Sequence, residues 1–373
     1  MADFSTDLQA TAKQLGFTLT GICPAVSPDG FSHLREWLDA GYAGSMHYLE
    51  QRYDAYAHPT HVLDGARSIL MLAVDYQTEP PHQTAAGQGR VARYAWGTAD
   101  YHDLIHDRLK QLKKWYLQQH PQAHVRGVVD TAPLMEREFA QLAGLGWVGK
   151  NTLLLNRQAG SWFFLAALLT DEELAYDAPH QTDHCGSCTA CLDACPTAAF
   201  PQPYVMDASR CLSYLTIELR DPIPHELRSE IGDWVFGCDI CQEVCPWNRH
   251  APTSTEAALL PTTDANPMDL IALFELDDTT FRERFRKTPL WRPKRRGILR
   301  NAAMVLGNQR APQAIPALSR GLADEEPLVR AAAAWALGEI GGAIAQQLLE
   351  DRQALEREEV VSAEITRALA LHH

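Results

Sequence analysis

The sequence of 373 residues lacks any long hydrophobic run. Its longest strongly apolar segment, residues 162–169, falls well short of the roughly 20 residues that a membrane-spanning helix needs. The first ten residues are polar and acidic, without the apolar core of a secretory signal. We therefore expect a cytoplasmic protein that makes no contact with a membrane.

Positive charge is also scarce, with 33 Lys and Arg against 47 Asp and Glu and a formal net charge of −14. As a whole such a chain repels nucleic acid, so RNA or DNA binding would require a local basic surface. Hydrophobic residues make up 46% and charged residues 21% of the chain, which excludes wholesale disorder. A globular chain of this length is expected to form more than one domain.

Cysteine is nearly absent outside one segment. Eight of the nine cysteines lie within residues 185–245. The ninth, Cys23, is expected to be a small buried hydrophobic residue. Disulfide-rich chains are usually small, secreted and poor in core, so the clustered thiols indicate bound metal instead.

The cysteine spacing matches that of bacterial ferredoxins. In the run Cys185-x2-Cys188-x2-Cys191-x3-Cys195-Pro196, three thiolates are expected to bind one cubane cluster and the fourth to reach a second cluster. The run Cys238-x2-Cys241-x3-Cys245-Pro246 repeats the last three positions, and Cys211 can supply the first. We expect two 4Fe–4S clusters, held by Cys185, Cys188, Cys191 and Cys245, and by Cys195, Cys211, Cys238 and Cys241. Two structural zinc sites are the alternative, although zinc does not need this spacing twice.

The N-terminal 180 residues have the pattern of an α/β domain. Apolar runs predict strands at residues 68–74, 125–129, 152–155 and 162–169, and helical spacing predicts a helix over 103–119. A further helix is expected to begin at Pro133, a favoured first helical residue, and to end at Gly144.

Two features near that helix could contact a ligand. Asp130 follows a predicted strand, at the edge that faces the ligand crevice in α/β sheets, but it could equally be a plain helix N-cap. Residues 144–149 have the form G-x-G-x-x-G, yet they follow a helix and precede a strand, the reverse of a dinucleotide-binding loop. We therefore predict no NAD site, and expect a loop whose backbone approaches a ligand or a neighbouring segment.

The C-terminal part is helical, alanine-rich and repetitive. Residues 302–307 recur as 333–338, and this period of 31 residues predicts stacked helix pairs of the HEAT type, with a generic helical bundle as the alternative. Residues 281–300 contain nine basic side chains and one acidic one, Glu283. A run of one charge sign predicts a phosphate-binding surface, where Trp291 could stack on a base or belong to the core.

Several of these motifs, in this order, resemble the epoxyqueuosine reductases, the cobalamin- and iron–sulfur-dependent enzymes of queuosine tRNA modification. The similarity lies in residues 93–97, 100–102, 129–137, 144–151 and 297–303 and in both cysteine runs. It implies an α/β cobalamin-binding domain over 1–178, a bacterial two-cluster ferredoxin-like module over 179–254, and tRNA-binding α-helical HEAT-like repeats over 255–373.

The resemblance also implies a reaction and its residues. Epoxyqueuosine at the wobble position of a tRNA anticodon would be reduced to queuosine, with electrons passing through two 4Fe–4S clusters to base-off cobalamin and with Asp130 as proton donor. Cobalamin contacts are expected from Tyr94, Trp96, Asp130, Leu154 and Ser161. The expected tRNA contacts are Arg292, Lys294, Arg295, Arg296 and Arg300. A monomer served by an external low-potential donor of the flavodoxin or ferredoxin type completes the expectation.

Two other classes of function are compatible with the cysteine motifs. One is a corrinoid and iron–sulfur reductase that acts on a small electrophilic molecule, in the manner of a dehalogenase. The basic run and the helical repeats count against it, because a small substrate requires neither. The other is a non-enzymatic electron carrier, which would leave the N-terminal 180 residues without a task.

Overall fold

The structure, a computed structural model, describes residues 2–371 and contains two compact units. The first unit takes in residues up to 78, 100–209 and 240–258; the second takes in 79–99, 210–239 and the chain from 259 onward. Each unit draws on more than one of the three domains expected from sequence, whose boundaries stay a prediction. Within residues 2–371, no helix combines the length and the apolar character needed to cross a bilayer.

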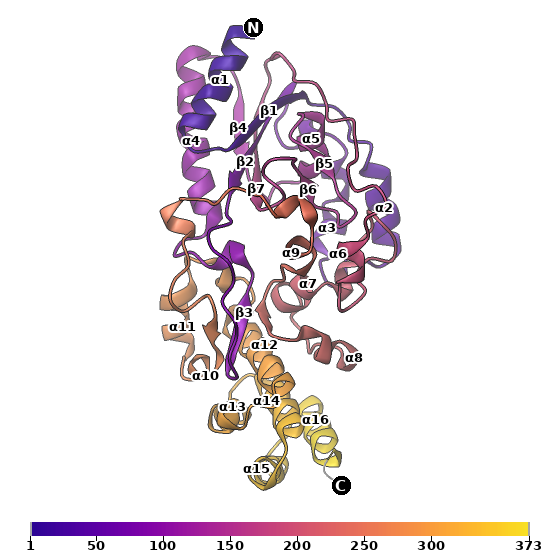
Figure 1. Ribbon diagram of the computed structural model, residues 1–373, viewed down its shortest axis with the longest axis vertical. Helices are drawn as coiled ribbons and strands as arrows, with labels where there is room; N and C mark the ends of the chain where they lie inside the picture. The colour runs from indigo at the N-terminus through magenta and orange to yellow at the C-terminus, as the bar shows by residue number, and fades with distance from the viewer. Residues whose placement is uncertain (1, 372–373) are drawn as a thin grey trace. The chain divides into compact units, whose positions relative to one another are not determined.

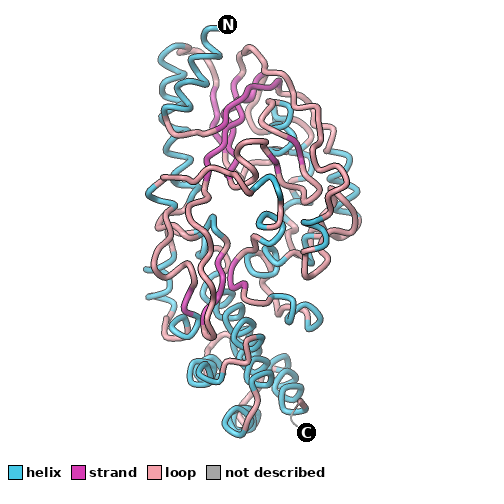
Figure 2. The backbone as a smooth tube through the Cα atoms, viewed as in Figure 1, coloured by secondary structure: helices cyan, strands magenta, loops and turns pink. Residues whose placement is uncertain are grey.

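The first unit is built on a four-stranded sheet with the order β1-β2-β7-β4 (Figures 1 and 2). Its strands are β1 (Leu19–Pro24), β2 (Ser68–Asp75), β4 (Val125–Val128) and β7 (Phe163–Thr170). All three pairings are antiparallel. The strands predicted near 68–74, 125–129 and 162–169 are confirmed, whereas β1 was not predicted. The crevice argument for Asp130 does not hold, because it applies to parallel strands.

Helices cover both faces of this sheet, which explains why β2 is buried along its whole length. Helices α1 (Ala2–Gln14) and α4 (Tyr101–Gln119) lie together on one side (Figure 1). On the other side, Phe139 and Ala140 of α5 (Glu136–Leu142) share a core with alternate residues of the sheet. Cys23 lies in that core with no exposed surface, as predicted, and burial raises the pKa of its thiol to about 12.

Helix α5 begins at Glu136 rather than at the predicted Pro133. Asp130 adopts a left-handed backbone with φ 54°, and tight turns follow it, in which Thr131 N–H donates to the Val129 carbonyl and Leu134 N–H to the Ala132 carbonyl. A chain turning in this way cannot yet be helical. The helix does end before Gly144, whose φ of 79° suits a residue just past a helix C-terminus.

The G-x-G-x-x-G segment leads into a small hairpin of β5 (Trp147–Val148) and β6 (Leu154–Leu155). Only the last two residues of the strand predicted at 152–155 are extended, and they pair with β5 rather than with the main sheet. A Cβ atom at Gly146 would collide with the carbonyl oxygen of Leu155. The expectation of a close backbone approach is therefore confirmed, and the neighbour is the partner strand.

The first unit is completed by short helices. These are α2 (Phe31–Asp39), α3 (Tyr48–Gln51), α6 (Ala190–Asp193) and α9 (Ile240–Glu243).

The second unit joins a three-stranded sheet to a helical array (Figure 2). Strand β3 (Gln88–Val91) lies between β8 (Trp234–Phe236), which is parallel to it, and β9 (Met268–Asp269), which is antiparallel. The shorter helices are α7 (Leu212–Ile217), α8 (His225–Arg228), α10 (Leu270–Leu273) and α11 (Asp278–Phe285).

The C-terminal helices pack closely through the repeated small residues. They are α12 (Lys294–Asn308), α13 (Ile315–Leu322), α14 (Pro327–Ile340), α15 (Ala343–Gln353) and α16 (Glu359–Ala370). A Cβ atom at Gly307 would lie 2.6 Å from the Trp335 ring, and one at Gly338 would lie 2.7 Å from Ala368. The repeat thus marks the points where α12 meets α14 and α14 meets α16, as expected for stacked helices.

Candidate active site

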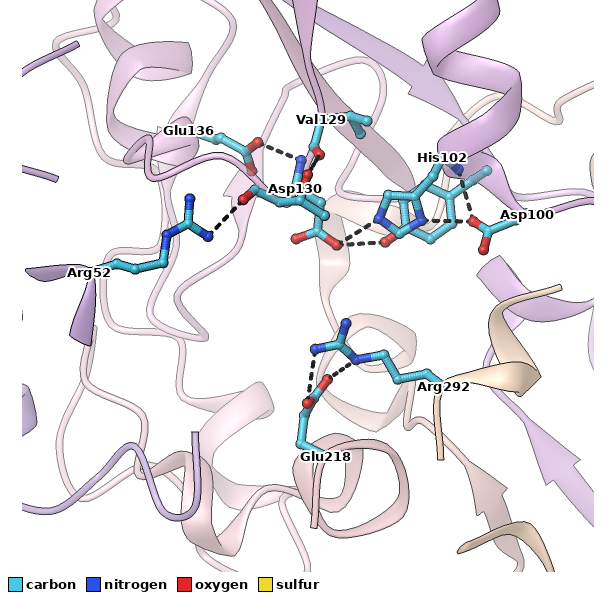
Figure 3. Close-up of polar contacts among 10 residues, drawn as sticks. Arg52, Asp100, His102, Val129, Asp130, Glu136, Glu218 and Arg292 are labelled. Atoms are coloured by element: carbon cyan, nitrogen blue, oxygen red, sulfur yellow. Dashed lines mark hydrogen bonds and ion pairs between the residues drawn. The ribbon is translucent and has the colours of Figure 1, made fainter. Parts of the chain in front are cut away.

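Asp130 follows β4 and is held in a strained conformation. A positive φ is uncommon for a residue other than glycine, and such strain is often found at functional sites. The backbone N–H of Asp130 donates to Oε1 of Glu136 at 2.9 Å, which ties the turn to the first residue of α5 (Figure 3). Arg52 donates to the carbonyl of Thr131 at 3.1 Å and braces the same turn.

The Asp130 carboxylate meets side chains from the first turn of α4. Its Oδ2 accepts from the Tyr101 hydroxyl at 2.8 Å and lies 3.2 Å from Nε2 of His102 (Figure 3). The other ring nitrogen, Nδ1, lies 2.7 Å from Oδ1 of Asp100, which also caps the helix by accepting from the His102 backbone N–H. The Tyr101 ring stacks on Phe164 of β7, with 4.1 Å between centroids. The helix start therefore fixes the position of the Asp130 carboxylate.

This network gives His102 an unusual charge state. Burial alone would lower its pKa, but hydrogen bonds to Asp100 and Asp130 outweigh burial and raise the pKa to about 9. Burial would raise the pKa of Asp100, and the hydrogen bonds from His102 bring it below the usual value. At neutral pH His102 is thus an imidazolium between two carboxylates.

Glu136 and Arg137 add a second titratable pair to the site. Burial, assisted by the charge of Asp130, raises the pKa of Glu136 to about 8. Arg137 is exposed, and its guanidinium donates to the Thr152 carbonyl at 2.8 Å. At neutral pH Glu136 is therefore mostly a neutral acid, next to the Asp130 carboxylate, which contacts the His102 ring and accepts from the Tyr101 hydroxyl.

A cavity of about 200 Å³ opens beside Asp130. Its polar wall comprises Tyr101, Asp130, Glu136, Arg137 and Ser161, and its apolar wall comprises Leu153, Leu154, Phe163, Phe164 and Leu165. Three predicted site residues, Asp130, Leu154 and Ser161, thus line one cavity. The Ser161 backbone N–H donates to Oδ1 of Asn248 at 2.7 Å, and its Oγ accepts from Nε2 of Gln242 at 3.1 Å.

Tyr94 and Trp96 belong to the second unit. The Trp96 side chain is buried in the core of that unit with 1% exposure, and its Nε1 donates to the Val91 carbonyl at 2.7 Å. Trp96 therefore has no surface to offer a corrin ring, and this predicted contact is wrong. Tyr94 is partly buried and packs near Phe236, and its predicted role stays a prediction.

Four of the cysteines meet in the first unit. Cys185, Cys188, Cys191 and Cys245 line a cavity of about 230 Å³, together with Lys150, His184 and Trp247. Around a single zinc ion, four thiolates would lie about 3.8 Å apart. Nowhere in residues 2–371 do three or more His, Cys, Asp or Glu side chains converge so as to hold one ion. Thiolates distributed around a cavity suit a multi-iron cluster that fills it.

The remaining four cysteines divide between the two units. Cys195 and Cys241 belong to the first unit, and Cys211 and Cys238 to the second. Cys211 directly precedes α7, and Cys241 lies in α9. Their grouping around a second cluster stays a prediction.

The basic run of the second unit contains arginines of two kinds. Arg300 is 1% exposed, and it donates to the carbonyls of Leu215, Leu219 and Asp221 at 2.6 to 2.8 Å. The prediction that Arg300 contacts tRNA is wrong, because its guanidinium is buried and bonded to backbone. Arg295 is also mostly buried and pairs with Asp324.

Three other predicted tRNA contacts do reach the surface. Arg292 is half-exposed and forms two hydrogen bonds to Glu218, at 2.7 and 3.0 Å (Figure 3). Nζ of Lys294 lies 3.8 Å from the centroid of the partly buried Trp291 ring. Arg296 is exposed, with its guanidinium 3.8 Å from Glu326. A basic surface thus remains, smaller than the sequence suggested.

The sequence placed Tyr101 and His102 only in a stretch expected to lie near the corrin, and gave Glu136 and Arg137 no role beyond the family motif. Their signal was positional, because all four lie in the first turn of a helix whose beginning is near Asp130. Without the fold, nothing in the sequence shows that these two helix starts meet.

Comparison with known proteins identifies three matched segments of the chain. Residues 57–131 match the family described as epoxyqueuosine reductase QueG, DUF1730. Residues 184–248 match the 4Fe-4S double cluster binding domain, and residues 295–370 match HEAT repeats. The predictions of a two-cluster iron–sulfur module and of HEAT-type repeats are confirmed.

Comparisons over the whole chain also find epoxyqueuosine reductases. The epoxyqueuosine reductase of Pseudomonas aeruginosa is 42% identical over 348 residues, covering 90% of this chain and 94% of that protein. A crystal structure of an epoxyqueuosine reductase with an epoxyqueuosine-modified tRNA stem loop superimposes with a TM-score of 0.93 at 30% identity, covering 99% of this chain and 98% of that one. The Bacillus subtilis enzyme, in a structure whose aspartate-bearing catalytic loop is swung out of the active site, gives 0.92 at 30% identity, covering 99% of each chain.

Proposed function

This chain belongs to the epoxyqueuosine reductase family and is therefore an oxidoreductase, and we propose that it reduces epoxyqueuosine to queuosine at the wobble position of a tRNA anticodon. The observation that carries the proposal is the cavity beside Asp130, where a positioned carboxylate faces an apolar wall. Removal of the epoxide oxygen as water takes two electrons and two protons, so the site must supply both.

Base-off cobalamin is the proposed cofactor of this cavity. The wall of Leu153, Leu154, Phe163 and Phe164 suits the apolar face of a corrin ring, and the lining residues include no histidine or cysteine that could ligate cobalt. A cavity lined in this way fits a cobalamin whose cobalt has no axial ligand from the protein. When bound, cobalamin would supply a strongly reducing metal centre, since axial ligation sets the potential of a metal.

We assign the proton chemistry to Asp130. An alkoxide is a poor leaving group unless it is protonated, so an acid beside the departing oxygen is required. The Asp130 carboxylate borders the cavity and contacts the His102 imidazolium, so Asp130 can pass the His102 proton to the departing oxygen as negative charge develops there, leaving His102 neutral until it takes up another proton. A catalytic loop that bears an aspartate is described for the Bacillus subtilis relative and supports this assignment.

Electrons would reach the site through the iron–sulfur module. The proposed ligand sets are those of the ferredoxin pattern, Cys185, Cys188, Cys191 and Cys245 for one cluster and Cys195, Cys211, Cys238 and Cys241 for the other. Cys188 is exposed, so the first of these clusters lies near the surface, where an external low-potential donor could deliver single electrons.

The exposed basic residues of the second unit are proposed to bind the tRNA backbone. Arg292, Lys294 and Arg296 reach the surface, as do Arg282, Arg284, Arg286 and Lys287 around α11. A relative crystallised with an epoxyqueuosine-modified stem loop supports tRNA as the substrate. A small-molecule substrate would leave this surface unexplained.

The direct test is turnover with a defined substrate. Anaerobically purified protein, supplied with cobalamin and a strong reductant, should convert epoxyqueuosine in a tRNA anticodon stem-loop into queuosine, scored by mass spectrometry of the digested RNA. The free epoxyqueuosine nucleoside serves as the matched substrate and should react far more slowly. Conversion of neither substrate, with both cofactors bound, would refute the proposal.

A further inference from the structure

Trp147 carries a buried hydrogen-bond donor that has no partner within residues 2–371. The indole is 1% exposed, and Nε1 makes no hydrogen bond. The indole nitrogen can act only as a donor, and a buried donor left unsatisfied costs about 1–3 kcal/mol. Such an orphan in an otherwise well-packed site calls for an acceptor that the polypeptide itself does not provide.

The position of Trp147 indicates what that acceptor is. The indole forms one apolar cluster with Leu155 and Cys245, against which Cys185 and Trp247 pack. Both cysteines line the 230 Å³ cavity that is proposed to hold a cluster. The His180 and His184 rings also lie against the indole, but their Nε2 atoms lie within hydrogen-bond distance of Thr182 Oγ1. The sulfurs of these thiolates and of the cluster they would bind are the other acceptors next to the indole.

The indole is also fixed in place by its surroundings. The His180 ring stacks on it at 5.5 Å, and the rings of His184 and Trp247 meet it edge-on at 4.8 and 5.1 Å. Its backbone is in β5, paired with Leu155 of β6. A side chain packed on its face and edges cannot turn its N–H toward solvent, so the donor stays buried beside Cys245.

We propose that Nε1–H of Trp147 donates a hydrogen bond to a sulfur of the cluster held by Cys185, Cys188, Cys191 and Cys245, and thereby raises the reduction potential of that cluster. Reduction adds one negative charge to the cluster, and hydrogen bonds to its sulfurs stabilise that charge. This inference rests on the proposed ligand set. It makes Trp147 a tuning residue, which eases electron entry from the external donor without touching substrate.

The test is a redox titration of the anaerobically prepared holoenzyme, followed by electron paramagnetic resonance. Trp147→Phe keeps an aromatic ring and removes the donor. We expect about a tenfold fall in the reduced-to-oxidised ratio of one cluster at its wild-type midpoint, which is about 59 mV for a one-electron couple. The midpoint of the other cluster should not move.

Trp247→Phe is the matched control, because Trp247 lines the same cavity and packs on the same rings. Because Trp247 borders the cavity, this variant should move the midpoint by what a change in packing alone contributes, less than Trp147→Phe does. An equal shift in both variants would mean that packing or solvent access sets the potential, and would overturn the proposal. Unshifted midpoints in Trp147→Phe would overturn it as well.

A second measurement, which keeps Trp147 in place, tests the proposal if Trp147→Phe loses its cluster. With tryptophan labelled with ¹⁵N in the indole ring, the reduced cluster should show a ¹⁵N coupling that persists in Trp247→Phe. The lack of any such coupling would overturn the hydrogen bond alone. Wild-type protein without an iron–sulfur signal, or with zinc in its place, would instead overturn the proposed cluster and the inference with it.

Discussion

The Asp130 site and the basic run of the second unit are both dense in charge, but they hold that charge in opposite ways. At Asp130, charged groups contact one another and leave a carboxylate at the wall of a cavity. In the basic run, backbone carbonyls and acidic side chains take up Arg300 and Arg295, and only part of the run reaches the surface. Charge in a sequence therefore indicates function only where the fold leaves it accessible.

Backbone strain separates the two regions further. Asp130 stands at φ 54° and is held there by Glu136, whereas Arg300 lies inside the regular helix α12. Strain has to be stabilised by the surrounding structure, and at Asp130 the stabilising contacts also position a proton-bearing group. Arg300 instead stabilises the fold, by satisfying carbonyls in the segment that follows α7.

The largest effect is expected from Asp130→Asn. The amide keeps the size of the side chain but cannot deliver a proton, so turnover of epoxyqueuosine-containing tRNA should fall on the order of a thousandfold, in the range of general acid catalysis. Cobalamin binding and the iron–sulfur spectrum should remain. Asp107→Asn, on an exposed part of α4, is the control and should be fully active. Activity within tenfold of wild type in Asp130→Asn would remove this aspartate from the mechanism.

Arg300→Gln should lower the stability of the fold without removing a group that takes part in the reaction. It would leave buried carbonyls of Leu215, Leu219 and Asp221 without donors, and we expect a loss of about 3 kcal/mol in the free energy of unfolding. Chemical denaturation monitored by circular dichroism measures this loss. Arg296→Gln is the comparison, since that side chain is exposed and its stability should change by less than about 0.5 kcal/mol. Equal stability of the two variants would contradict the structural role of Arg300.

Cysteine spacing predicted the iron–sulfur module well because most ligands of such clusters recur at short, fixed spacings. The same holds for the repeat of residues 302–307 and 333–338, whose small residues mark helix contacts. The basic run was harder, because a local count of charge cannot show that Arg300 is enclosed by a segment some 80 residues earlier in the chain.

The Asp130 network could not be predicted for a related reason. Tyr101, His102 and Glu136 reach Asp130 only because β4 ends near the starts of α4 and α5. The left-handed turn at Asp130 was also hidden, since Pro133 by itself favours a helix start. At the Asp130 site and in the basic run alike, the sequence indicated the chemical character of the residues but not their contacts with distant segments.

The pH dependence of stability should test the charge network around Asp130. The pKa of His102 is raised to about 9 from an ordinary value of 6.5, so its stabilising contribution is complete below pH 6.5 and disappears as the pH rises through 9. Glu136, whose pKa is raised to about 8, acts in the same direction, because ionising it in the folded state is unfavourable. Between pH 6.5 and 9 the wild type should lose more stability than His102→Gln, as measured by urea denaturation. Parallel curves would show that His102 is not held as an imidazolium.

The smallest effect is expected from a single exposed cation of the basic run. Arg296→Gln should weaken the binding of an anticodon stem-loop severalfold at low salt and reduce the slope of log affinity against log salt by about 1, as for one lost phosphate contact. Arg310→Gln is the matched control, because Arg310 is an exposed arginine of the same unit outside the basic run, and its slope should equal that of the wild type. The measurement is fluorescence anisotropy at several salt concentrations. If both variants shift the slope equally, residues 281–300 bind RNA no more than any other exposed arginine does. The basic run would then differ from the Asp130 site only in how deeply its charges are buried.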